Sequence, residues 1–341
     1  MVQLTQQKVP VVDFGQFLNG SREEKQKIAS KIDVAFRKVG FVYLSNHGVP
    51  QERVDECFEW SKKFFDLPTE TKNLAPHPPG GAHHRGYSGL GVEKVSQNIF
   101  DEAELNKLRS IPDYKESFES GNVNDESQPN IWLPEDVLHG FRRYMESFFK
   151  DCEGLVHEIL KALAISLELD DEEQLSGTHK QSLFQLRLLH YPPVPASLLR
   201  REEKSRISAH SDFGTLTLLF QDPTGGLEVE SPPTSQNFIP VPPIPGTVLV
   251  NIGDLMERWS NGRWRSTVHR VVAPPADASK SVEEGEEILK PRYSIPFFAT
   301  ADPETVIEAL KGTWDGEGNP KKFEKITAWG YVQMRMAALY S

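Results

Sequence analysis

Two residues with metal-binding side chains stand two positions apart within residues 207–220. His210 and Asp212 lie in an apolar, β-prone setting, and on a strand residues i and i+2 point to the same face. An imidazole and a carboxylate would then converge on one point, and the distant His269 offers a third ligand. Two histidines and one carboxylate on one side of a metal leave the opposite positions open for oxygen and substrates, which is typical of a non-haem iron(II) site.

A His-x-Asp pair is a weak signal by itself, because a capped turn or a structural hydrogen bond produces the same pattern. The setting favours the metal interpretation. Gly214 follows almost at once, and a strand expected at residues 215–220 carries the chain away. Short strands and glycine turns then lead to the segment that contains His269.

A second pair, Arg292 and Ser294, also has the spacing that places two side chains on one strand face. A guanidinium group stays charged and can grip a carboxylate in two places, and a neighbouring hydroxyl adds a third contact. The alternative is an ordinary surface ion pair. The flanking apolar residues, among them Ile295 and Phe297, favour a buried strand and therefore an anchor for a carboxylate.

Another histidine pair, His83 and His84, lies in a stretch rich in Pro, Gly and His that is typical of a loop. Adjacent loop residues seldom both reach one ion, and no cysteine or acid lies at metal-site spacing, so we expect surface or pocket-lining histidines. Tyr87, close to them in sequence, is the stronger candidate for the wall of a pocket.

Composition and charge narrow the class of protein. The chain has 341 residues and a net charge of −11, and it does not concentrate the Lys and Arg residues that a nucleic-acid partner requires. No apolar run reaches membrane-spanning length. We therefore expect a soluble, cytoplasmic protein with a small-molecule substrate, no nucleic acid and no membrane. Cys57 and Cys152 lie in apolar helical patterns and are expected to be buried free thiols.

The elements that would position these residues change character along the chain. Ser21 and Glu24 form a capping-box signature for a first helix, and apolar residues at alternating steps of three and four predict a long helix over residues 138–163. From residue 182 onward, short strands separated by Gly and Pro predict a closed or two-sheet β unit. Short helices are expected at 307–310 and 326–340. These patterns suggest four regions, at 1–125, 126–181, 182–300 and 301–341.

The order of these motifs resembles the iron(II)- and 2-oxoglutarate-dependent dioxygenases of the isopenicillin N synthase-like group, and the likeness covers nearly the whole chain. The amino-terminal region carries VPVVD (9–13), GFVY (40–43), NHGV (46–49), FFDLP (64–68), GYS (86–88) and KESF (115–118). The later motifs are HSD (210–212), NIGD (251–254), HRV (269–271) and RYS (292–294).

The resemblance implies a mainly β fold with α elements: a double-stranded β-helix, or jelly roll, with flanking helices and an α/β N-terminal extension. It implies that His210, Asp212 and His269 hold Fe(II). It also implies that the far carboxylate of 2-oxoglutarate meets Arg292 and Ser294, and that Tyr191 lies near this cosubstrate. Plant members often carry Asn two residues before that tyrosine, whereas this chain has Leu189.

The activity that the resemblance implies is oxidation of an unactivated C–H bond of a small molecule, in specialised metabolism, with 2-oxoglutarate and O2 consumed and ascorbate as an optional stimulant. Hydroxylation is the default outcome, and desaturation or ring formation occurs in the same family. Five residues that border the motifs are candidates for the substrate wall: Tyr87, Phe118, Arg187, Phe213 and Phe298.

Two alternatives remain open at this point. Some relatives use the same Arg-x-Ser pair to hold the substrate's own carboxylate and need no 2-oxoglutarate, and Leu189 leaves this interpretation open. The second alternative is a jelly roll without catalysis, metal-free or zinc-holding, that only binds a ligand or a partner.

Overall fold

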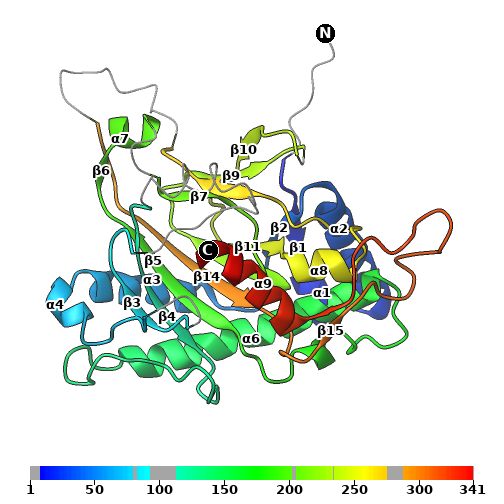
Figure 1. Ribbon diagram of the computed structural model, residues 1–341, viewed down its shortest axis with the longest axis horizontal. Helices are drawn as coiled ribbons and strands as arrows, with labels where there is room; N and C mark the ends of the chain where they lie inside the picture. Colours follow the sequence, from blue (N-terminus) through cyan, green and yellow to red (C-terminus); the bar gives the residue numbers. More distant parts are fainter. Residues whose placement is uncertain are drawn as a thin grey trace, which may run out of the picture.

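The structure is a computed structural model that describes residues 8–79, 83–92, 113–201, 205–232, 234–274 and 287–340. Two β-sheets face each other, and the long helices cover the outer side of the larger sheet (Figure 1). This is the jelly roll with flanking helices that the sequence predicts. Among the described residues, no helix combines the length and the apolar character needed to cross a bilayer.

The larger sheet has eight strands, and its four central strands come from the second half of the chain. Strands of the amino-terminal region pair onto both of its edges, so that the edges of the central strands are covered. In spatial order the strands are β1 (Val11–Asp13), β2 (Phe41–Ser45), β11 (Thr247–Ile252), β8 (Leu216–Gln221), β14 (Arg292–Ala299), β5 (Gln185–Tyr191), β4 (Glu116–Gly121) and β3 (Gly86–Ser88).

The smaller sheet has four strands, in the order β10 (Phe238–Pro240), β9 (Leu227–Glu230), β12 (His269–Val271) and β7 (Ile207–His210). Two separate strand pairs lie outside both sheets. They are β6 (Val194–Pro195) with β13 (Ile288–Leu289), and β15 (Val306–Ile307) with β16 (Ile326–Thr327).

Alternating side chains of the larger sheet pack into two different cores, because successive side chains of a strand point to opposite faces. On β2, Val42 and Leu44 belong to the core beneath the helices, whereas Phe41 and Tyr43 belong to the core between the sheets. The inter-sheet core also receives side chains of the smaller sheet, among them Val229. The larger sheet is therefore packed on both faces, by one core beneath the helices and by another between the sheets.

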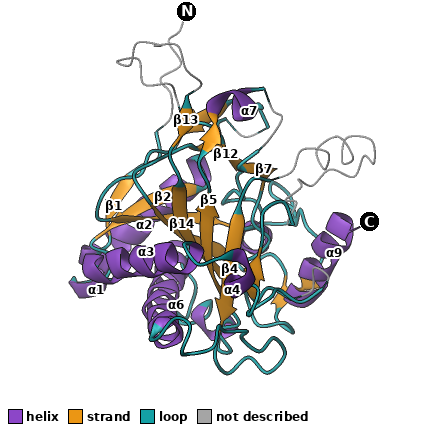
Figure 2. Cartoon of the chain, turned by 90° about the vertical axis from the view of Figure 1, so that its left-hand side faces the viewer, coloured by secondary structure: helices purple, strands orange, loops and turns teal. Residues whose placement is uncertain are grey.

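The helices lie mainly on the outer face of the larger sheet, and α9 lies apart from α1, α2 and α3 (Figure 2). Their bounds are α1 (Gly15–Asn19), α2 (Arg22–Lys38), α3 (Gln51–Phe65), α4 (Thr69–Lys72), α6 (Phe141–Ser166), α7 (Ala196–Arg200), α8 (Asp254–Trp259) and α9 (Ala328–Tyr340), with a 3-10 turn at Ser176–Thr178.

Most of the predicted helical features are present. The capping box at Ser21 and Glu24 begins α2, and the predicted long helix is α6, which starts after Gly140 and buries its apolar stripe. Cys57 and Cys152 are buried and free. The prediction for residues 307–310 is wrong, because β15 occupies the start of this segment; an apolar pattern over four residues cannot distinguish a helix from a strand.

A buried ionic network joins the amino-terminal region to the central strands. The carboxylate of Glu116 on β4 accepts hydrogen bonds from Lys72 Nζ at 2.8 Å and Tyr87 Oη at 2.6 Å, and His190 Nδ1 on β5 lies 2.7 Å from its other oxygen. Burial alone would raise the pKa of Glu116, but these hydrogen bonds and the Lys72 charge outweigh it, so that the pKa is lowered. The network therefore depends on an ionised carboxylate.

We expect Glu116→Gln to lower the free energy of unfolding by about 3–5 kcal/mol at neutral pH, because buried Lys72 would lose its counter-ion. The pKa of Glu116 is lower in the folded state, so its contribution is present above the ordinary carboxyl pKa and is lost as pH falls through the folded value. Urea denaturation of both proteins should therefore show their difference shrinking in acid. Glu308→Gln, which removes an exposed partner of Lys321, is the control and should change little; an equally small effect of Glu116→Gln would contradict the expectation.

Candidate active site

A cavity of about 1580 Å³ is lined by residues of both sheets. The smaller sheet contributes His210 and His269, and the larger sheet contributes Tyr191, Arg292 and Ser294. Sequence positions more than a hundred residues apart thus open onto one space. All the candidates for metal and cosubstrate binding line this cavity, Asp212 included.

His210, Asp212 and His269 converge at one point of the cavity. The two histidines are opposite one another in the antiparallel pairing of β7 with β12. Asp212 Oδ1 lies 3.9 Å from Nε2 of His210 and 3.8 Å from Nε2 of His269, and the three ligand atoms all lie within 4.8 Å of one another. A divalent metal fits between atoms at this separation, because each ligand would lie about 2 Å from it.

The two imidazoles are oriented for metal binding. Nδ1 of His210 lies 2.8 Å from the Ser208 carbonyl, and Nδ1 of His269 lies 3.1 Å from the Thr267 carbonyl. A carbonyl only accepts, so each Nδ1 carries the hydrogen and each Nε2 presents its lone pair to the cavity. Burial and the neighbouring His269 also lower the pKa of His210, which keeps its ring neutral.

The carboxylate of Asp212 is held from the larger sheet. Its Oδ2 accepts hydrogen bonds from Thr217 Oγ1 at 2.6 Å and from Asn251 Nδ2 at 2.7 Å, which leaves Oδ1 directed at the histidines. Burial opposes ionisation of Asp212, but the two imidazoles and these two donors outweigh it and lower its pKa. Two imidazole nitrogens and one ionised carboxylate form a donor set that suits Fe(II).

The backbone differs from the sequence expectation at Asp212. Strand β7 ends at His210, so the two side chains do not share a strand face. Asp212 lies in the turn that follows, where its carbonyl accepts the backbone N–H of Asp254 at 2.8 Å. Convergence was predicted correctly, but it results from this turn rather than from the strand period.

Close backbone contacts explain why Gly214 stands two residues after Asp212. A Cβ on Gly214 would lie 2.3 Å from the Ala299 carbonyl oxygen, and one on Gly253 would lie 2.3 Å from the Gly214 carbonyl oxygen. No side chain fits at either position without a shift of the backbone. These two glycines therefore let the turn that carries Asp212 pack directly against β14 and the start of α8.

Arg292 and Ser294 share a face of β14, as expected. Arg292 is buried; its Nη1 donates to Ser294 Oγ at 3.1 Å and its Nη2 to Gln221 Oε1 at 3.2 Å, while Nε has no hydrogen-bond partner. Its guanidinium also lies 5.0 Å from the ring centre of Tyr191, which is opposite it on β5. No acid of the described residues forms an ion pair with Arg292. A buried cation without a counter-ion suits an anionic ligand such as a carboxylate.

The proposed substrate positions separate into two groups. Tyr87, Arg187, Phe213 and Phe298 line the cavity, with the Arg187 guanidinium 5.7 Å from the Phe298 ring centre. Phe118 does not line it and is a correction to the sequence prediction. Its ring packs among core aromatics, at 4.6 Å from the ring of Phe64, because it points to the helix side of β4.

The histidine-rich loop contains an arrangement that the sequence did not reveal. Ligand atoms of His77, His84 and Glu119 lie within 4.8 Å of one another, and both histidines line the cavity. Glu119 comes from β4, too far along the chain for a spacing rule to find it. Its buried carboxylate already forms an ion pair with Arg187, so this group is best described as a polar wall of the cavity. His83 also lines the cavity, as a pocket-lining residue should.

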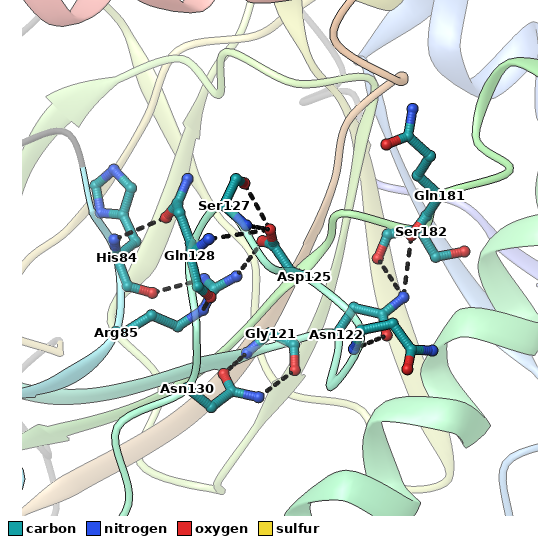
Figure 3. Close-up of polar contacts among 11 residues, drawn as sticks. His84, Arg85, Gly121, Asn122, Asp125, Ser127, Gln128, Asn130, Gln181 and Ser182 are labelled. Atoms are coloured by element: carbon teal, nitrogen blue, oxygen red, sulfur yellow. Dashed lines mark hydrogen bonds and ion pairs between the residues drawn. The ribbon is translucent and has the colours of Figure 1, made fainter.

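The loop after β4 completes the same wall. Arg85 pairs with Asp125 at 2.9 Å and donates from Nε to the Gln128 carbonyl at 2.9 Å (Figure 3). The other carboxylate oxygen of Asp125 accepts from the backbone of Ser127 and of Gln128, both at 3.0 Å. These four residues all line the cavity. The loop after β4 is therefore held by hydrogen bonds within itself and by its contacts with Arg85.

Helix α9 forms a further wall that sequence reasoning missed. Arg335 on this helix is buried, pairs with Asp254 at the start of α8, and places its guanidinium 4.1 Å from the ring centre of Phe213. The only sequence signal was the helix itself, since nothing indicated where it packs. Four of its described residues line the cavity: Ala328, Trp329, Val332 and Gln333.

Comparisons with known proteins agree with this geometry. Residues 9–149 match the model described as the non-haem dioxygenase in morphine synthesis N-terminal family, and residues 182–301 match the 2OG-Fe(II) oxygenase superfamily. The chain is 39% identical, over 98% of its length and 97% of the relative's, to the 2-oxoglutarate-dependent dioxygenase frbA of Dothideomycetidae sp. (strain 11243). It is 37% identical to the proline hydroxylase buaE of Petromyces alliaceus, over 98% and 100% of the two lengths.

Among solved structures, a full-length protein of Neurospora crassa in complex with alpha-KG and thymine is 39% identical, covers 97% of each chain and superposes with a TM-score of 0.85. The relatives named as 2-oxoglutarate-dependent and the complexes with alpha-KG support a 2-oxoglutarate-dependent enzyme over both alternatives raised from the sequence. The chain therefore belongs to the 2OG-Fe(II) oxygenase superfamily and is an Fe(II)- and 2-oxoglutarate-dependent dioxygenase.

Proposed function

We propose that His210, Asp212 and His269 hold Fe(II), and that Arg292, Ser294 and Tyr191 hold the far carboxylate of 2-oxoglutarate. The observation that carries this proposal is that the convergent donor set and the buried, uncompensated Arg292 open onto the same cavity. The overall reaction converts 2-oxoglutarate, O2 and a substrate C–H bond into succinate, CO2 and the hydroxylated product.

Each residue has a task that its contacts support. The Ser208 and Thr267 carbonyls fix the imidazoles, while Thr217 and Asn251 fix the carboxylate. When bound, iron supplies the redox chemistry by which the keto acid is decarboxylated and the C–H bond is oxidised. The chain's part is to orient both reactants at the metal, and the position of the substrate carbon decides between hydroxylation, desaturation and ring formation.

The substrate is a small molecule held by the aromatic and polar walls. Phe213, Phe298 and Leu219 supply apolar surface, and Arg187 beside Phe298 supplies a cation whose ion pair with Glu119 limits its movement. A cavity of about 1580 Å³ has room for the cosubstrate and a multi-ring scaffold together. The family description that names morphine synthesis supports a role in specialised metabolism.

The basic test of the function is release of succinate from 2-oxoglutarate by the Fe(II)-loaded enzyme in air. We expect stimulation by some members of a substrate panel that includes thymine and L-proline, the compounds suggested by the relatives. Absence of succinate under every condition, with iron bound, would refute the proposal.

Removal of the carboxylate ligand should abolish iron binding. We expect Asp212→Ala to purify without stoichiometric iron, and Thr217→Val to weaken iron binding by roughly 10–100-fold, because the carboxylate loses the donor that orients it. Thr313→Val is the matched control: this buried threonine donates to the Leu310 carbonyl far from the cavity, and its loss should leave iron affinity unchanged. Iron content after dialysis measures all three. Full iron in Asp212→Ala would exclude the assignment.

Loss of the Arg292 charge should weaken the binding of 2-oxoglutarate and leave the binding of iron unchanged. Arg292→Met removes the charge that faces the carboxylate, and we expect its Kd for 2-oxoglutarate to rise by roughly 30-fold or more. Ser294→Ala removes one neutral hydrogen bond and should cost roughly 2–10-fold. Anaerobic calorimetry on Fe(II)-loaded protein gives both values. Iron content should stay at the wild-type level, and unchanged 2-oxoglutarate affinity in Arg292→Met would rule out the anchor.

Two phenylalanines of the larger sheet offer a matched pair for the substrate wall. Phe298 lines the cavity and Phe118 lies in the core, so Phe298→Leu should raise KM several-fold for a compound that stimulates succinate release, with little loss of stability. Phe118→Leu should lower the free energy of unfolding by about 1–3 kcal/mol and leave KM unchanged. The reverse pattern would show that the cavity wall has been assigned wrongly.

A further inference from the structure

Arg206, which directly precedes β7, is buried without an ionic partner. Its side chain is only 1% exposed, and it is among the largest fully buried side chains of the protein. Nη2 donates to the Lys290 carbonyl at 3.1 Å, whereas Nε and Nη1 have no hydrogen-bond partner. Over the ranges that the structure describes, no carboxylate lies within ion-pair distance of it. The one hydrogen bond that its guanidinium makes within the described residues is thus to a neutral carbonyl group.

A second buried guanidinium lies close by. Arg206 and Arg292 both lie within cation–π distance of the same ring, at 5.8 Å and 5.0 Å from the centre of Tyr191. Burial, and then the like charge of Arg292, lower the pKa of Arg206 to about 10, so Arg206 remains charged at neutral pH. The attraction of the Tyr191 ring does not neutralise either cation.

The acid whose charge acts on Arg206 accepts its hydrogen bonds from other groups. Asp222 contributes a favourable charge to Arg206, but its Oδ2 accepts the backbone N–H of Tyr293 at 2.6 Å and its Oδ1 that of Thr224 at 2.9 Å. It forms no ion pair with either arginine. The described chain therefore keeps two like charges together in a buried site, an arrangement that opposes folding unless an anion is bound there.

A purely structural role is the simplest alternative. In that case Arg206 would serve by stacking on Tyr191 and by its contact with the Lys290 carbonyl, and its charge would be incidental. A neutral side chain of similar length could fill the same space at lower desolvation cost. The two explanations differ in one respect: only the electrostatic one makes the charge matter to an anionic ligand.

We propose that Arg206 is a positioning residue for 2-oxoglutarate, whose charge adds to that of Arg292 in attracting the far carboxylate and whose stacking fixes the Tyr191 ring beside it. The inference rests on the proposed cosubstrate site, in which Arg292 and Ser294 make the direct contacts. Arg206 does not line the cavity, so it acts through Tyr191 and through the electric field at short range, where screening by salt is weak. Its consequence is selectivity for keto acids that carry a second carboxylate.

The test compares two keto acids on the full-length, Fe(II)-loaded enzyme without oxygen. 2-Oxoglutarate carries the far carboxylate, and 2-oxopentanoate has the same carbon chain without it. By calorimetry we expect Arg206→Met to weaken 2-oxoglutarate binding on the order of tenfold and to leave 2-oxopentanoate unchanged. Arg206→Lys, which keeps the charge, should retain most of the preference.

Thermal unfolding of the ligand-free proteins gives a second readout. Arg206→Met should be at least as stable as the wild type, because it removes an uncompensated buried charge, while the stabilisation by added 2-oxoglutarate should be smaller. Arg263→Met is the matched control: Arg263 pairs with Asp33 away from the cavity, so its loss should lower stability and leave the ligand preference intact.

Each outcome decides the matter. Equal effects of Arg206→Met on both keto acids, or no effect on either, would overturn the proposal. If Arg206→Met does not fold, Arg206→Gln is used in its place. If neither neutral variant folds, Arg206 has a structural role, and the proposal is overturned as well. A wild-type enzyme that binds iron and 2-oxopentanoate but not 2-oxoglutarate would instead refute the proposed cosubstrate site itself.

Discussion

The hydrogen bonds that hold the carboxylate of Asp212 join residues of both sheets in one site. Asp212 is ionised and buried, and it needs donors for the oxygen that does not face the histidines. Those donors, Thr217 and Asn251, belong to two strands of the larger sheet, whereas His210 and His269 belong to the smaller one. The convergence of His210, Asp212 and His269 therefore depends on how the two sheets pack against each other.

A buried cation in the wall of the same cavity shows how folding stability is balanced against ligand binding. Arg292 is a desolvated cation without a counter-ion among the described residues, which costs folding energy. The two hydrophobic cores on either face of the larger sheet stabilise the strands that carry it, and the ligand would recover the cost on binding. The network around Glu116 behaves differently, because Lys72 and its acid compensate each other within the chain. The charge of Lys72 is thus compensated within the chain, whereas that of Arg292 is compensated, under the proposed function, only when an anion binds.

From the sequence, the types of the site residues could be predicted better than their positions in the fold. Residue types and their order were enough to predict the jelly roll and the convergence of His210, Asp212 and His269 at one point. The strand argument for Asp212 failed, since a turn held by Asp254 replaces the strand there. Phe118 was misplaced because both faces of β4 are buried, so that alternation carries no information about which face meets the cavity. Glu119, Gln221 and Arg335 were missed for a third reason: their partners are set by tertiary packing and leave no local signal.

The mixed origin of the larger sheet has a consequence for folding kinetics. Strand β2 pairs with β11 about two hundred residues further along the chain, as in the register of Leu44 with Val248. Such pairings have a high contact order, and loops of this length must close before the sheet gains any stabilisation from them. The two matched segments are consequently not separable folding units: the later segment alone would expose β11 as an unpaired, apolar edge that invites aggregation.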